Sequence, residues 1–147
     1  MLATRALRSA VYVVGHKLTA GAIVVCHHDG RLLLVKQRLG EGRWGLPGGL
    51  LKSREQPVDC AVREFREETG LELQPGRLRL LDAYVQPFAW HLDTVFQLLD
   101  PGRLADPESR TMVEVTDARW WPVSGLPPLR REARLLLARH PGLIDPG

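Results

Sequence analysis

The sequence predicts an α/β fold in which a mixed β-sheet is covered by two helices. The chain of 147 residues has the length of one domain, and at this size it can bury a core of its own. Five stretches rich in apolar and β-branched residues are expected to be strands, and two stretches with helical periodicity are separated by strands. This alternation is typical of a layered α/β sandwich.

The first 17 residues are expected to be an N-terminal extension, and we place the domain itself at residues 18–147. Residues 11–14 have the composition of an edge strand, although the segment could equally be a loose tail. A strand here that crosses to a second copy would make the protein a homodimer.

A β-hairpin is expected to open the domain. Residues 19–26 and 31–37 form two apolar runs, and Asp29-Gly30 between them suits the left-handed backbone of a tight turn. Residues 40–49 then carry five glycines and Pro47, which predicts a sharply bent loop.

The first helix is expected at residues 57–69. Pro57 fits the first helical position, and Gly70 fits the position just past the end. Small and apolar residues at helical spacing form its inward face: Val58, Ala61, Val62, Phe65 and Thr69.

The second half of the chain is expected to add three strands and one helix. The strands are placed at residues 77–86, 92–99 and 112–122, with a loop at residues 100–110. The helix is placed at residues 128–140, because Pro128 suits its start and Pro141-Gly142 ends it.

Composition excludes several classes of protein. The two cysteines, Cys26 and Cys60, cannot form a disulfide framework, so we expect a reduced, cytoplasmic protein. No apolar run approaches the roughly 18–20 residues of a membrane span. The net charge is only +3 and the arginines are scattered, which argues against a nucleic-acid partner.

The first predicted helix carries an acidic stripe. Glu64, Glu67 and Glu68 stand at positions i, i+3 and i+4, so their carboxylates lie close together beside the apolar face. Such carboxylates repel one another, and a hard divalent cation with oxygen ligands would compensate for this. The alternative is a solvated face on which Arg63 and Arg66 are the ion-pair partners.

The residues around this stripe form a longer pattern. Gly49 is followed by five residues, then Glu55, then seven residues and the run from Arg63 to Leu71, which gives G-x(5)-E-x(7)-R-E-U-x-E-E-x-G-U with U apolar. The sequence therefore resembles the Nudix hydrolases at their signature box. Segments 43–49 and 119–122 extend the likeness to about residues 18–140. The resemblance implies an α/β/α sandwich, a divalent metal, and hydrolysis of a nucleoside diphosphate linked to another group.

The resemblance also implies ligands for the metal. Glu64, Glu67 and Glu68, together with the Gly48 carbonyl, are expected to hold one or more Mg²⁺ or Mn²⁺ ions. Glycines at this point let the backbone approach a metal closely.

Further roles in catalysis follow in the same way. The general base is expected to be Glu64 or a glutamate on a later loop, for which Glu108 and Glu114 are the candidates. Arg63 is expected to pair with Glu55 or Glu67 and to orient the cluster.

A small-molecule nucleotide is the expected partner, and its contacts are less well defined. Arg38 and Lys52 are candidates for binding phosphate, although Lys52 could belong to a solvated loop. Phe88 and Trp90 could stack on a base or ribose, or pack in the core. Pro87, sixteen residues beyond the box, resembles a marker of the ADP-ribose pyrophosphatases, or it is a turn proline.

Three functions remain open on this basis. The first is hydrolysis of ADP-ribose or another nucleotide sugar, and the second is a nucleoside triphosphate pyrophosphatase that sanitises the nucleotide pool. A different class, a non-catalytic nucleotide-binding sensor, would be favoured by loss of a box glutamate, and all four are present.

Overall fold

The computed structural model describes residues 17–39, 41–108 and 114–144. In these residues the strands form two sheets, where the sequence predicted one. The first sheet contains, in spatial order, β5 (Gly48–Leu50), β1 (Thr19–Val25), β7 (His91–Leu98) and β6 (Leu78–Val85). β1 runs parallel to β7 and the other neighbours are antiparallel, so this sheet is mixed.

The second sheet is antiparallel. It contains β2 (His27–His28), β3 (Arg31–Gln37), β4 (Trp44–Gly45) and β8 (Val115–Pro122), with β3 paired to the other three. The predicted turn between β2 and β3 is confirmed, because Asp29 and Gly30 both have positive φ, at 48° and 65°.

Strands β4 and β5 correct the loop expected at residues 40–49. Gly45 pairs with Val35 in the second sheet, and Gly48 pairs with Ile23 in the first. A side chain at Gly48 would overlap the carbonyl oxygen of Ala22, so glycine here serves close strand pairing.

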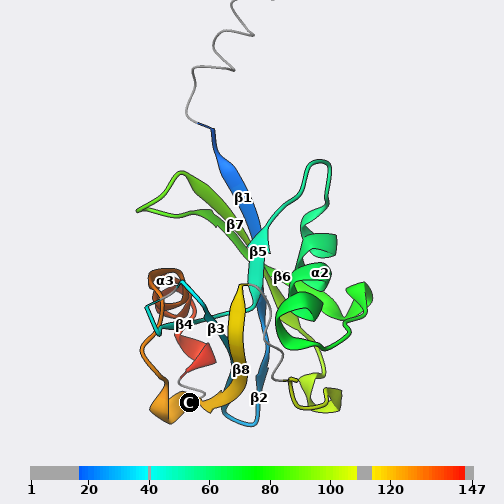
Figure 1. Ribbon diagram of the computed structural model, residues 1–147, viewed down its shortest axis with the longest axis vertical. Coiled ribbons are helices and arrows are strands. Elements are labelled where there is room, and N and C mark those ends of the chain that lie inside the picture. The colour runs from blue at the N-terminus through cyan, green and yellow to red at the C-terminus, as the bar shows by residue number, and fades with distance from the viewer. Residues whose placement is uncertain (1–16, 40, 109–113, 145–147) are drawn as a thin grey trace, which may run out of the picture.

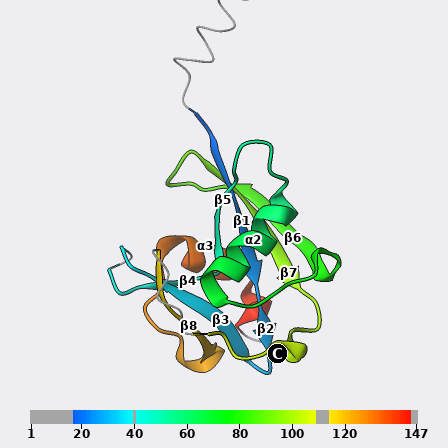
Figure 2. The ribbon, with the colours of Figure 1, turned by 45° about the vertical axis from the view of Figure 1, so that its right-hand side comes forward.

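Two helices cover opposite faces of the first sheet (Figure 1, Figure 2). Alternate residues of β1 point to opposite sides, so Val24 packs with Phe65 of α2 (Pro57–Thr69), whereas Val25 packs with Leu136 of α3 (Arg131–Arg139). The result is the expected α/β/α sandwich. Four short 3₁₀ helices complete the described elements: η1 (Pro75–Arg77), η2 (Pro101–Arg103), η3 (Val123–Gly125) and η4 (Pro141–Leu143).

Helix α2 has the predicted bounds. Pro57 occupies its first turn, and Gly70 ends it in the left-handed conformation, with φ at 75° and its N–H donating to the Arg66 carbonyl. Gln56 precedes the helix and makes no side-chain cap, which leaves the N-terminus without the usual Ser, Thr, Asp or Asn.

Helix α3 begins at Arg131, three residues later than predicted. The Pro128 carbonyl accepts a hydrogen bond from the Trp44 N–H at 2.9 Å, and the Arg130 N–H donates to the Trp44 carbonyl at 2.8 Å. Residues 128–130 therefore follow β4 as extended chain, and this pairing overrides the preference of Pro128 for a helix start.

The remaining strand predictions differ by small shifts. β1 ends one residue early, at Val25, whereas β6 and β7 each differ from expectation by one residue at both ends. β8 starts at Val115, and the expected start at Met112 lies outside the described residues, as does the edge strand expected at residues 11–14.

Both cysteines are buried free thiols. Burial raises the pKa of Cys26 to about 12 and that of Cys60 to about 11, which makes both unreactive near neutral pH. None of the helices in the described part of the chain is long and apolar enough to cross a membrane.

Asp82 on β6 bonds two residues at the C-terminal end of α3. Its carboxylate accepts from Arg139 Nε at 2.9 Å and bonds His140 Nε2 at 2.8 Å, and the Arg139 hydrogen bond holds the pKa of Asp82 at about 2. Because this pKa is depressed, the stabilisation is present above the unfolded-state pKa, near 3.9, and is lost as the pH falls toward 2.

We expect Asp82→Asn to lower the melting temperature at pH 7 by about 2–4 °C, and the difference to shrink steadily below pH 4. Thermal unfolding followed by circular dichroism measures both. Asp29→Asn is the matched control, because the Asp29 side chain is mostly exposed and Asn also tolerates positive φ. A difference that stays constant down to pH 2.5 would contradict the assignment.

Candidate active site

Arg63 on α2 gathers the acidic residues of the site. Its Nε lies 2.7 Å from Glu55 Oε1, its Nη1 lies 2.6 Å from Glu64 Oε1 and 3.4 Å from Glu67 Oε2, and its Nη2 donates to the Leu50 carbonyl at 3.1 Å. The sequence left open whether Arg63 pairs with Glu55 or with Glu67. In the structure its guanidinium bonds both of them, and Glu64 as well. The Arg63 hydrogen bonds hold the pKa of Glu55 at about 2, so Glu55 is fully ionised near neutral pH.

Two glutamates of the cluster are buried. Glu68 is only 6% exposed and Glu64 is also buried, so the alternative of a solvated acidic face does not hold for these two, whereas Glu67 is exposed. Burial raises the pKa of Glu64, and burial together with the nearby Glu64 carboxylate raises the pKa of Glu68 well above its usual range. Two desolvated carboxylates of like charge favour a positive partner.

The glycines of β5 bring backbone against these carboxylates. The Gly48 N–H donates to Glu68 Oε2 at 3.3 Å. A Cβ at Gly49 would overlap the carboxylate of Glu64, so only glycine leaves that side chain where it stands.

We therefore expect Gly49→Ala to displace the Glu64 carboxylate while the sheet still forms, because the group that must move is the end of a flexible side chain. Catalysis is expected to fall about 10- to 100-fold, as is usual when a reacting group is misplaced, with a melting temperature close to that of the wild-type protein. Steady-state kinetics and thermal unfolding measure the two effects. Gly76→Ala, at a position with open space around it, is the control that should change neither.

A cavity of about 400 Å³ opens over this cluster, and we call it the acidic cavity. Among the described residues that line it are Lys52, Arg63, Glu64, Glu67, Glu68 and Glu114. Glu114 thus joins the helix glutamates, and its charge contributes to the raised pKa of both Glu64 and Glu68. The other loop candidate, Glu108, lies at the C-terminal end of α2, where its N–H donates to the Thr69 carbonyl at 3.1 Å, and it is not among the described residues that line the acidic cavity.

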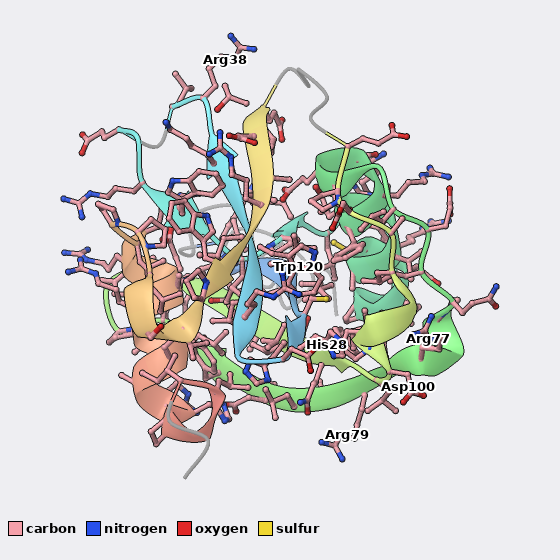
Figure 3. All side chains as sticks on the ribbon, turned by 90° about the horizontal axis from the view of Figure 1, so that it is seen from below. His28, Arg38, Arg77, Arg79, Asp100 and Trp120 are labelled. Atoms are coloured by element: carbon pink, nitrogen blue, oxygen red, sulfur yellow. The ribbon has the colours of Figure 1, made fainter. Side chains whose placement is uncertain are left out.

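Three of the expected substrate-binding residues are not among those that line the acidic cavity in the described part of the chain. Arg38 follows β3, its N–H donates to the carbonyl of the lining residue Glu114 at 2.9 Å, and Figure 3 shows its exposed side chain pointing outward. The Phe88 ring is stacked under the Arg131 guanidinium, 4.7 Å from its Cζ, and Trp90 is 59% exposed. These two aromatic residues lie on the turn between β6 and β7, where Pro87 also lies, so the turn alternative holds for Pro87.

A second cavity, of about 390 Å³, lies on the other side of β5, between β1, β7 and the start of α3, and we call it the β1–α3 cavity. Its polar residues include Gln86, His91, Asp93 and Arg130, none of which the sequence analysis assigned to the site. The available signal was Asp93, a carboxylate inside a predicted strand and on the same strand face as Val95.

The donor set of the acidic cavity fits a hard divalent cation. Carboxylate and carbonyl oxygens are the ligands that Mg²⁺ and Mn²⁺ prefer, and burial raises the pKa of two of these carboxylates, so a bound cation would favour their ionised form. In the described residues no three His, Cys, Asp or Glu side chains converge on one point. The acids are thus gathered on one helix face, with Arg63 bonded to Glu64 and Glu67.

Comparisons with known proteins agree with this chemistry. The family model described as NUDIX domain matches residues 15–140. A Bacillus subtilis protein provisionally named as an ADP-ribose pyrophosphatase is 30% identical over 105 residues, which are 69% of this chain and 49% of that protein. A Streptomyces rubellomurinus protein named CMP-5'-(N-acetyl-N-hydroxy-3-aminopropyl)phosphonate hydrolase is 34% identical over 121 residues, 78% of this chain and 57% of that protein. The chain spans about half the length of these relatives.

Solved structures show the same fold. The MutT NUDIX hydrolase of Burkholderia pseudomallei has a TM-score of 0.70 and 28% identity, and the match covers 85% of this chain and 99% of that one. A bifunctional NMN adenylyltransferase/ADP ribose pyrophosphatase of Francisella tularensis, crystallised with AMP and a manganese ion, has a TM-score of 0.73 over 98% of this chain and 46% of that one. At 16% identity the second likeness is one of fold alone.

Proposed function

The chain belongs to the NUDIX domain family, and from its acidic cavity we propose that it is a divalent-cation-dependent hydrolase that cleaves the pyrophosphate linkage of a nucleoside diphosphate derivative. ADP-ribose or another nucleotide sugar is the first substrate class. The observation that carries the proposal is the cluster of Glu55, Glu64 and Glu67 around Arg63, beside the buried Glu68. The name of the Bacillus subtilis relative supports ADP-ribose as the first substrate to test.

Glu64, Glu67 and Glu68, with the Gly48 carbonyl, would hold Mg²⁺ or Mn²⁺. When bound, a divalent cation would neutralise the charge of the pyrophosphate and, as a Lewis acid, would activate water. Glu64 lines the acidic cavity and is the first candidate to accept a proton from the attacking water. Glu114 lines the same cavity and is the second candidate base.

Arg63 and Glu55 would act through the other residues. Arg63 holds one oxygen of Glu64 and one of Glu67, which fixes the carboxylates against the helix. Glu55 in turn bonds two nitrogens of Arg63 and accepts the Lys52 N–H at 2.8 Å, so it ties the loop before α2 to the site. Lys52, at the cavity edge, is placed to contact a phosphate.

Product analysis with Mg²⁺ or Mn²⁺ tests this function. The panel contains ADP-ribose, other nucleoside diphosphate sugars, dinucleoside polyphosphates and nucleoside triphosphates, each with wild-type protein, Glu67→Gln and the matched control Glu72→Gln on an exposed side chain. Reactions in ¹⁸O-labelled water, followed by ³¹P NMR, show which phosphorus is attacked.

Cation-dependent cleavage of a P–O–P bridge that Glu67→Gln loses and Glu72→Gln keeps is the expected result. Release of pyrophosphate from triphosphates, with no cleavage of nucleotide sugars, would favour the nucleotide-sanitising alternative. Binding of nucleotide and metal without any turnover would overturn the hydrolase and favour a sensor.

A further inference from the structure

The β1–α3 cavity adjoins the acidic cavity across a single short strand. Gly48 and Gly49 of β5 line the β1–α3 cavity, Leu50 lines both cavities, and the Gly48 N–H bonds Glu68 of the acidic cluster. One extended ligand can therefore lie across β5 with a part in each cavity. Figure 1 and Figure 2 show the β6–β7 turn and α3, which enclose the β1–α3 cavity, on the same side of β1.

A continuous array of polar contacts forms one wall of the β1–α3 cavity. Asp93 is only 3% exposed; its Oδ2 accepts a hydrogen bond from Gln86 Nε2 at 2.6 Å, and its Oδ1 lies 3.1 Å from His91 Nε2. Thr19 Oγ1 lies 2.7 Å from His91 Nδ1 and extends the array to the edge of β1. Each carboxylate oxygen can accept two hydrogen bonds, so Asp93 keeps acceptor capacity for a ligand.

The array is held in one position by the neighbouring backbone. Gly21 pairs with Asp93 in the sheet, and a Cβ at Gly21 would come within 2.9 Å of both His91 Nε2 and the Gly49 carbonyl oxygen. The His91 ring therefore occupies the space that any other residue at position 21 would fill. An acceptor fixed in this way is suited to recognition, because little conformational freedom is lost when a ligand binds.

The lining of the cavity indicates which ligand group it takes. None of the described residues that line it is Phe, Tyr or Trp, and its apolar contacts come from small or aliphatic side chains such as Ile23, Leu46 and Ala133. A nucleobase usually gains affinity by stacking on an aromatic ring, and no such ring lines this cavity in the described residues; Phe88 and Trp90 lie at its edge, on either side of the lining residue Ala89. A carboxylate beside an amide and an imidazole instead matches the hydroxyl groups of a sugar, which both donate and accept.

Arg130 supplies positive charge where the two cavities meet. Its guanidinium bonds Gln37 and, at 3.1 Å, Glu132, and it lines the β1–α3 cavity. It also lies close enough to Glu68 to lower that carboxyl's pKa. A phosphate between the two cavities would therefore pass near a guanidinium.

We propose that the β1–α3 cavity binds the sugar of a nucleoside diphosphate sugar, and that Asp93, held by Gln86 and His91, is the residue that determines which sugar is accepted. The proposal rests on the hydrolase function proposed above and assigns the group on one side of the cleaved linkage.

Two substrate series test the proposal. ADP-ribose, ADP-glucose and ADP-mannose vary the sugar, whereas ADP-glucose, GDP-glucose and UDP-glucose vary the base. Asn at position 93 keeps the shape of Asp but turns an N–H₂ donor toward the donors of Gln86 or His91. For Asp93→Asn we expect KM for the preferred sugar to rise about 10- to 100-fold with kcat nearly unchanged. Discrimination among sugars should collapse, and discrimination among bases should remain.

Matched variants keep the test decisive. Asp117→Asn removes the partner of Arg119 on β8, outside both cavities, and should change neither ratio. If Asp93→Asn does not fold, Gln86→Met and Thr19→Val weaken the array from its two ends and should reduce sugar discrimination in the same direction. Calorimetric titration of ADP-ribose and ADP-mannose in EDTA gives the same comparison for binding without turnover.

The outcomes separate the two proposals. Wild-type protein that cleaves none of the panel overturns the hydrolase, while the calorimetric comparison still decides the role of Asp93. Cleavage in which Asp93→Asn lowers all substrates equally, or changes only the ratios among bases, overturns the sugar assignment and leaves the hydrolase intact.

Discussion

Glu68→Gln is expected to raise the melting temperature in EDTA and yet to lower pyrophosphate hydrolysis about 100- to 1,000-fold in Mg²⁺. The wild-type carboxylate is buried, and its pKa is raised well above the usual range by burial and by Glu64. Ionising it in the folded state therefore costs free energy, whereas an amide keeps the shape and can still accept the Gly48 N–H. The loss of activity follows because a neutral amide is a poor ligand for a divalent cation.

The sign of the pH dependence follows from the same shift. A group whose folded-state pKa is raised stabilises the fold fully only below its unfolded-state pKa, about 4.3, and this stabilisation is lost as the pH rises through the folded-state value. In EDTA the advantage of Glu68→Gln should therefore be small at pH 4 and grow toward pH 7. Thermal unfolding across this range measures it.

Magnesium should reverse the order of stability. A cation that binds only the folded state raises the melting temperature with its concentration, so the wild-type protein should gain more from Mg²⁺ than Glu68→Gln does. Glu72→Gln, on an exposed side chain, should behave as wild type in both conditions. A lower melting temperature for Glu68→Gln in EDTA at pH 7 would show that the buried carboxylate is already compensated without a cation.

Arg63→Lys is expected to have the second large effect. A guanidinium bonds Glu55 through two nitrogens and reaches Glu64 and the Leu50 carbonyl at the same time, which a single ammonium cannot reproduce. We expect the unfolding free energy to fall by about 2 kcal/mol, less than the 3–5 kcal/mol of a fully broken buried pair. Activity should fall about 100-fold, because Glu64 and Glu67 lose their fixed positions.

A double-mutant cycle shows whether Arg63 acts through its partners. Glu55→Gln removes the main partner of Arg63, so the stability losses of Glu55→Gln and Arg63→Lys should be far from additive when combined. Chemical denaturation gives the free energies. Arg66→Lys on the exposed side of α2 is the control and should cost little. Additive losses would mean that Arg63 stabilises the fold independently of the acidic cluster.

Short sequence signals correctly predicted the helix ends and turns that depend only on neighbouring residues. The Pro57 and Gly70 signals gave both ends of α2, and Asp29-Gly30 gave the hairpin turn. The prediction of a loop in the glycine-rich segment before α2 is wrong, because β4 and β5 are strands only through pairing with residues that are distant in the sequence. Helix α3 begins late for the same reason, since Trp44 pairs with the backbone around Pro128.

The two cavities differ in how far the sequence predicts them. The acidic cluster is predictable because Glu64, Glu67 and Glu68 share one helix, whose periodicity is known in advance. The β1–α3 cavity draws Asp93 from a strand and Arg130 from the residue before a helix, and only the fold brings these together. Residue type alone predicts stacking by Phe88 and Trp90, and the structure places both on the turn on either side of Ala89, which lines the β1–α3 cavity.

The parallel pairing of β1 with β7 has a consequence for how the protein folds. The register joins Thr19 to His91, 72 residues apart, and β1 also carries the partners of β5, the strand that lies against Glu64 and Glu68. Closing a loop of this length costs conformational entropy before the contacts between β1 and β7 can compensate for it. The pairing of β1 with β7 should therefore be slow relative to helix formation. During synthesis on the ribosome the central strand acquires its second neighbour only after β7 has emerged. The acidic helix is thus synthesised before the sheet that it covers is complete.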